Sequence, residues 1–155
     1  MRIFFSSILT FTLIITSTVF AQQPSNPLSK LLDISNNLGN HISDLGDYQL
    51  ASKDENIARN SIADNANTLC AEIKSMNSKL ALFSLITTDE NRNKGIQYIK
   101  YDIEQANKVI DFLITNTNQN LSFIKNMAVI QNGNEIVKLF RETKETYTQI
   151  ESILK

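Results

Sequence analysis

The chain has 155 residues, the length of about one domain, and its 15 Lys and Arg against 16 Asp and Glu leave a net charge of −1. This balance lacks the broad positive field that nucleic-acid binding needs, so we expect no nucleic-acid partner. One Cys and one His exclude an intramolecular disulfide and the repeated imidazoles of most zinc and haem sites. The four Gly form neither a dinucleotide-binding nor a Walker-type loop.

Residues 1–21 have the three parts of a secretory signal peptide. Arg2 begins the segment, residues 3–15 are mostly apolar, and Val19 and Ala21 stand at the −3 and −1 positions of a cleavage site. The apolar run is shorter than the ~20 residues that a spanning helix needs. We predict cleavage before Gln22, no stable membrane anchor afterwards, and a secreted or periplasmic location. The alternative is an uncleaved anchor.

Residues 22–155 are predicted to form a single all-α domain, an antiparallel helical bundle of about four long helices with coiled-coil-like seams. The reason is that apolar residues recur at spacings of three and four, which places them on one face of a helix. The longest seam comprises Ala58, Ile62, Ala66, Leu69, Ile73, Met76, Leu80 and Phe83. Two others comprise Ile96, Ile99, Ile103, Ala106, Ile110 and Leu113, and Ile136, Phe140, Thr143, Tyr147, Ile150 and Leu154. The first helix has a shorter seam of Leu31, Ser35, Leu38, Ile42 and Leu45.

Helix-start and helix-stop residues divide these seams. Residues 25–27 offer an N-cap followed by Pro at the first helical position. Capping boxes are predicted at 52–55, with Ser52 and Glu55, and at 87–90, with Thr87 and Glu90. Residues 132–134, Asn-Gly-Asn, are predicted to stop one helix and start the next. The expected helices are 27–47, 53–85, 89–131 and 135–154.

Residues 114–120 are poor helix formers, and the seam slips there. We expect a kink or short break near 116–120, with the turn at 132–134. Two alternatives are open. The helix can be continuous through 116–120, or the chain can turn at 116–120 and leave Gly133 inside a kinked last helix.

Few residues suggest chemistry. His41, Asp44 and Asp47 lie at helical spacing and could hold a metal with water, but a polar helix flank explains them better, so we predict no metal, no cofactor and no enzymatic activity. Cys70 can be a buried small side chain, the link of a disulfide-bonded homodimer, or a reactive thiol. Asn120 begins the one Asn-x-Ser/Thr sequon of residues 22–155, and whether it is glycosylated is open.

The candidate partner-binding residues are Leu82, Phe83, Leu85 and Ile86, at the end of the second predicted helix. Apolar side chains surround the helix there, and the tip of a two-helix hairpin cannot easily cover them all. The alternative is that Leu82, Leu85 and Ile86 cap the core. We therefore expect an exported, non-enzymatic protein of inhibitor or immunity type that binds another macromolecule, most simply another protein. The alternative function is a small-ligand carrier or sensor that uses an apolar slot in the bundle interior.

Overall fold

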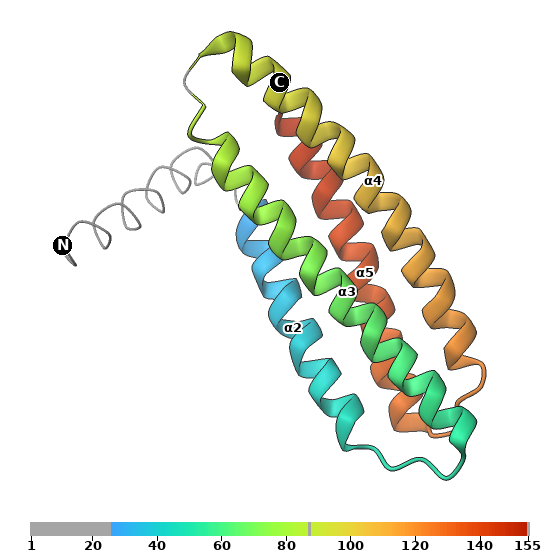
Figure 1. Cartoon of the computed structure of the whole chain (residues 1–155). Helices are drawn as coiled ribbons and strands as arrows, with labels where there is room; N and C mark the ends of the chain where they lie inside the picture. The colour runs from blue at the N-terminus through green and yellow to red at the C-terminus, as the bar shows by residue number, and fades with distance from the viewer. Residues whose placement is uncertain (1–25, 87, 155) are drawn as a thin grey trace, which may run out of the picture.

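The computed structural model describes residues 26–86 and 88–154, and the predicted signal peptide lies outside these ranges. It consists of four helices, α2 (Pro27–Asp47), α3 (Lys53–Phe83), α4 (Asp89–Leu121) and α5 (Met127–Ile153). Successive helices run in opposite directions and are joined at alternating ends of the bundle (Figure 1). The prediction of an all-helical bundle is confirmed. The division into a signal peptide and one domain stays a prediction.

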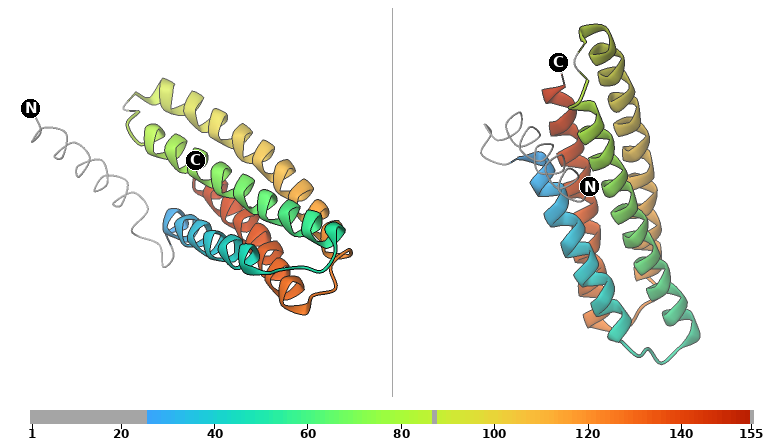
Figure 2. Two further views of the ribbon diagram at one scale, coloured as in Figure 1. Left: turned by 60° about the horizontal axis from the view of Figure 1, so that its bottom comes forward. Right: turned by 60° about the vertical axis from the view of Figure 1, so that its left-hand side comes forward.

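The helices form a four-membered array. α2 and α4 each pack against both α3 and α5, and α3 and α5 make a smaller contact across the bundle. α2 has 21 residues, whereas α3 has 31 and α4 has 33. α5 has 27 residues, and the paired ends of α3 and α4 extend past the start of α2 and the end of α5 (Figures 1 and 2).

The predicted seams form the core. Every predicted seam residue of α3, α4 and α5 is buried except Phe83, which is partly buried. In α2, Leu31, Leu38 and Leu45 are buried as predicted, Ile42 is partly buried, and Ile34 is buried in addition. Each fully buried Leu or Ile contributes about 1.5–3 kcal/mol to the hydrophobic stabilisation.

Three of the four predicted helix starts are confirmed, at Pro27, Lys53 and Asp89, and the first two have the predicted N-cap residue. Asn26 caps α2, since its side chain accepts a hydrogen bond from the Leu28 N–H at 3.1 Å. Ser52 caps α3 by accepting from the Glu55 N–H at 3.1 Å. The Glu55 carboxylate accepts from the Lys125 N–H in the α4–α5 loop at 2.7 Å, and this bond lowers the pKa of Glu55. The residue predicted to close a local capping box thus connects two distant segments.

The second capping box was wrong. Thr87 lies outside the described residues, and the N-cap of α4 is Thr88, whose side chain makes no capping hydrogen bond. α4 begins at Asp89, as predicted, but with Thr88 as its N-cap, and Glu90 binds Lys94 one turn further along.

The predicted turn at 132–134 was also wrong. α4 ends at Leu121, and α5 begins at Met127 with Asn126 as its N-cap, accepting from the Ala128 N–H at 3.0 Å. Gly133 lies inside α5 and has no positive φ. A Cβ placed on Gly133 would lie 2.5 Å from Cδ2 of Leu121. Glycine at this position thus permits close packing against the end of α4. The sequence pattern could not distinguish a glycine needed for such packing from one that stops a helix.

The predicted kink or break near 116–120 was wrong as well, because α4 continues through these residues. Their polar side chains bond across the α3–α4 interface. Asn65 Nδ2 donates to Asn116 Oδ1 at 2.8 Å and to Thr117 Oγ1 at 3.0 Å. Asn120 Nδ2 donates to Ser61 Oγ at 3.0 Å. Asn and Thr weaken a helix chiefly by competing for local backbone groups, and here their side chains are bound to another helix.

Candidate functional site

The four candidate partner-binding residues lie together at the projecting α3–α4 end. Leu82 is 67% exposed and Leu85 is 53% exposed. Phe83 and Ile86 are partly buried. Leu82 and Leu85 thus face solvent, whereas Phe83 packs against the core and Ile86 lies close to Gly95 of α4.

A hollow of about 340 Å³ lies beside these residues, which we call the tip groove. Its walls come from the end of α3, the following turn and the first part of α4: Lys79, Leu82, Phe83, Ile86, Gly95, Tyr98 and Ile99. A Cβ on Gly95 would lie 2.9 Å from Cδ2 of Phe83 and 3.1 Å from Cδ1 of Ile86. Gly95 therefore allows these two side chains to pack against α4, which shapes the floor of the groove.

An ion pair braces one wall of the tip groove. Lys79 Nζ lies 2.7 Å from Asp102 Oδ2, so it joins α3 to α4. Its hydrogen bond to Asp102 raises the pKa of Lys79, and the ammonium stays charged. The groove is thus apolar, with a charged group at its edge that is already held by a carboxylate.

Exposed apolar residues continue from the tip groove along α4. Tyr98, Tyr101, Val109 and Phe112 are all exposed. Their spacing places them on one face of the helix, away from the buried positions. Neither this stripe nor Gly95 was predicted from the sequence. The signal available was an apolar series in α4 that is out of phase with the seam.

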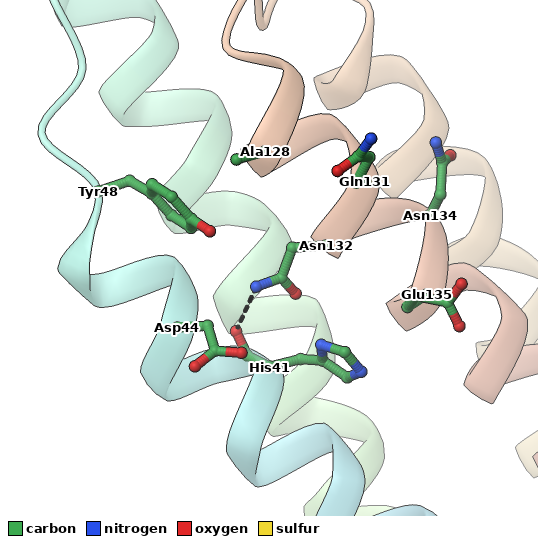
Figure 3. A pocket seen from close by; sticks show the side chains of 8 residues that line it. All are labelled: His41, Asp44, Tyr48, Ala128, Gln131, Asn132, Asn134 and Glu135. Atoms are coloured by element: carbon green, nitrogen blue, oxygen red, sulfur yellow. Dashed lines mark hydrogen bonds between the residues drawn. The ribbon is translucent and has the colours of Figure 1, made fainter.

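A second groove, of about 590 Å³, lies between α2 and α5 (Figure 3). Its lining residues belong to the last turns of α2, the C-cap of α2 and the first turns of α5. Its lining is mostly polar, from α2 and its C-cap on one side and α5 on the other: His41, Asp44, Tyr48, Ala128, Gln131, Asn132, Asn134 and Glu135. Asn132 Nδ2 donates to the His41 carbonyl oxygen at 3.4 Å. We call this the α2–α5 groove.

Two further candidate residues from the sequence, Asp47 and Cys70, line neither groove. Asp47 does not line the α2–α5 groove with His41 and Asp44. Within residues 26–86 and 88–154, no three His, Cys, Asp or Glu side chains gather as a metal site would require. Cys70 is partly buried, and its Sγ lies 3.7 Å from the Ser35 carbonyl oxygen of α2. This position fits the interpretation as a small packed side chain, and a Cys70-linked homodimer stays a prediction.

The sequon has a structural role. The Asn120 Nδ2 atom, which N-glycosylation would modify, donates hydrogen bonds to Ser61 and Asn116. A glycan attached to Nδ2 would replace one of its two N–H groups, so at least one of these bonds would be lost.

Tyr147 is fully buried in α5, and its hydroxyl has no hydrogen-bond partner among the described residues. Burial raises the pKa of Tyr147, so the phenol stays neutral in the folded protein. The ring packs in the core and lines neither groove.

Comparison of the chain with the sequence profiles of known families, with curated proteins and with solved structures finds no match in any of the three. Among the described residues, no helix is both long and apolar enough to span a membrane.

Proposed function

We propose that this is an exported, non-enzymatic protein that binds another protein through the tip groove. The observation that supports the proposal most directly is that Leu82 is exposed on the wall of an apolar hollow, with Leu85 exposed three residues further along the chain. Large apolar side chains that gather at one exposed place commonly mark a binding surface. Phe83 packs against the core and Ile86 lies close to Gly95 of α4, so these two side chains would support the surface from below.

The partner would insert apolar side chains into the tip groove. The volume of about 340 Å³ is at the lower end of the range of about 300–1,000 Å³ for small-molecule sites, and the groove is nearly devoid of groups that could orient a small polar ligand. Protein partners use such hollows for a few anchor residues and add contact area around them. The exposed stripe on α4, beginning with Tyr98, would provide this additional area.

Replacing both Leu82 and Leu85 with Ser should abolish or strongly weaken partner capture. Loss of two anchors should cost about 2 kcal/mol or more, which is about thirty-fold in Kd. The measurement is affinity capture from the exported fraction, followed by titration with the captured protein. The matched control replaces Leu32 and Ile57 with Ser, because these residues are similarly exposed but lie on other parts of α2 and α3.

A second variant tests the hollow without removing any apolar group. Gly95→Leu would push the Phe83 and Ile86 side chains away from α4 and obstruct the tip groove, so capture should again be lost while far-UV helicity persists. Gly39→Leu is the control, since no atom lies within 4 Å of a Cβ at Gly39. His41→Ala and Cys70→Ser should bind the partner normally. Equal capture by all variants would disprove the tip-groove proposal, and loss of far-UV helicity in the Leu82 and Leu85 variant would assign these residues to the core.

Export has its own test. If residues 1–21 are a signal peptide, N-terminal sequencing of the protein from the exported fraction should begin at Gln22. Recovery of the mature protein in membranes with Met1 or Arg2 intact would contradict both cleavage and a secreted or periplasmic location.

A further inference from the structure

The α2–α5 groove contains a buried hydrogen-bond acceptor for which the described residues provide no donor. Asn132 is only 8% exposed, and its amide nitrogen already donates to the His41 carbonyl oxygen. The Asn132 Oδ1 atom on the other side of the amide has no hydrogen-bond partner among the described residues. A buried carbonyl oxygen is stabilised by a donor, so this atom favours a ligand that brings an N–H or O–H group.

The other lining groups favour positive charge. Asp44 and Glu135 contribute a carboxylate from each side of the groove, and no Lys or Arg lines it. The Tyr48 ring adds an aromatic face, to which cations are attracted. The negative C-terminal end of α2 and the positive N-terminal end of α5 oppose each other here, so the carboxylates decide the sign of the local potential.

The position of His41 bears on how a ligand reaches Asn132. Figure 3 shows the His41 ring extending from α2 toward α5, on the same side as the Asn132 oxygen. The oxygen is shielded from solvent, so a ligand would have to displace a neighbouring side chain to contact it. The His41 side chain is only partly buried, and a rotamer change of such a residue is fast.

We propose that the α2–α5 groove binds a small organic cation with N–H donors, an aliphatic amine or a guanidine. The cation would lie between Asp44 and Glu135 and donate a hydrogen bond to Asn132 Oδ1. The volume of about 590 Å³ is within the range of small-molecule sites and is larger than that of the tip groove. Such a site would suit a carrier or sensor, with the ligand in a surface groove between two helices and not in the bundle interior.

The test is titration calorimetry of the purified protein with three probes, putrescine, spermidine and agmatine, at low and at physiological salt. At least one probe should bind with one-to-one stoichiometry, while 1,4-butanediol and succinate should not bind, because they lack the N–H donors and the positive charge. The side-chain amide resonance of Asn132 should shift in NMR spectra during the titration. Absence of binding by all three amines would overturn the proposal.

Variants separate a built site from general attraction to an acidic protein. Replacing Asp44 with Asn and Glu135 with Gln should weaken binding by about tenfold or more. The matched control, Asp33→Asn with Glu151→Gln, makes the same charge change on the same two helices at exposed positions outside the groove, and it should bind like the unmodified protein. Equal weakening by both double variants would overturn the proposal, because it would mean that only net charge matters.

Two single variants test the buried amide and the His41 ring. Asn132→Leu should weaken binding by about tenfold at unchanged helicity, since a hydrogen bond to a charged donor is lost. His41→Ala should bind at least as tightly, because the ring no longer has to move. If Asn132→Leu binds the amine normally, the hydrogen bond to Oδ1 does not exist and the proposal is wrong.

Failure of this proposal is distinguishable from failure of the tip-groove proposal. The two grooves lie toward opposite ends of the bundle and share no residue, so substitutions in them should act independently. The Leu82 and Leu85 double variant should bind amines normally, and Asn132→Leu should capture the protein partner normally.

Discussion

The single variants Leu69→Ala and Ile73→Ala should each lower the free energy of unfolding by about 2–5 kcal/mol. Both side chains lie in the middle of α3 and are fully buried in the core between the helices. Truncation would remove buried apolar contacts and leave a cavity that long, straight helices cannot easily close. Urea denaturation followed by far-UV circular dichroism measures the effect, with the m-value as a check on two-state unfolding.

Lys74→Ala is the control for these core variants. Lys74 is exposed on the same helix, so its replacement should change stability by no more than about 0.5 kcal/mol. Lys79 would be a poor control although it too lies off the seam, because its ion pair with Asp102 joins α3 to α4. Comparable losses in Leu69→Ala and Lys74→Ala would show that this seam does not face the core.

Asn65→Ala should destabilise the protein by about 2–3 kcal/mol, because it removes two hydrogen bonds across the α3–α4 interface and leaves Thr117 without its donor. Asn65 and Thr117 are both buried, so water cannot readily replace the lost partner. Thr115→Val is the control, since Thr115 is exposed and its hydroxyl bonds only to the Asp111 carbonyl oxygen of its own helix. It should change stability by less than about 0.5 kcal/mol.

A double variant tests whether the buried polar groups act as a unit. The double variant Asn65→Leu with Thr117→Val replaces a buried donor and one of its two acceptors by apolar groups of similar size. Its loss of stability should therefore be smaller than the sum of the losses in Asn65→Leu alone and Thr117→Val alone. Thermal or urea melts of the two single variants and the double variant measure this difference. Strict additivity, or a negligible effect of Asn65→Ala, would mean that the hydrogen bonds between these side chains do not hold α3 and α4 together.

The fold class and most of the core follow from local sequence patterns. Burial of one face is what stabilises an amphipathic helix, so the seam of α3 from Ala58 to Leu80 could be identified without knowing its neighbours. The caps at Asn26 and Ser52 could also be identified, because the groups that they bind are only two or three residues away. The bounds of α2 and the starts of α3 and α4 were predicted as observed.

The α4–α5 connection depends on contacts between helices, and there the local patterns failed. Gly133 carries the signature of a helix stop, but it is required for the close approach of Leu121. Residues 116–120 have low helix propensity by themselves, but they are helical in α4, where Asn116 accepts a hydrogen bond from Asn65 of α3 and Asn120 donates one to Ser61 of α3. In both cases the local structure depends on a contact with a residue of another helix. Local helix propensity is a weaker effect than such contacts.

In the candidate sites, too, some features follow from the local sequence and others depend on packing between helices. A run of apolar residues around one helix end predicted where Leu82 and Leu85 would lie, because a hairpin tip has few neighbours to cover them. The floor that Gly95 opens in the tip groove depends on the packing of α3 against α4. The α2–α5 groove could not be predicted at all, since it brings His41 and Asn132 together from segments about ninety residues apart and becomes a site only through the unmatched amide oxygen.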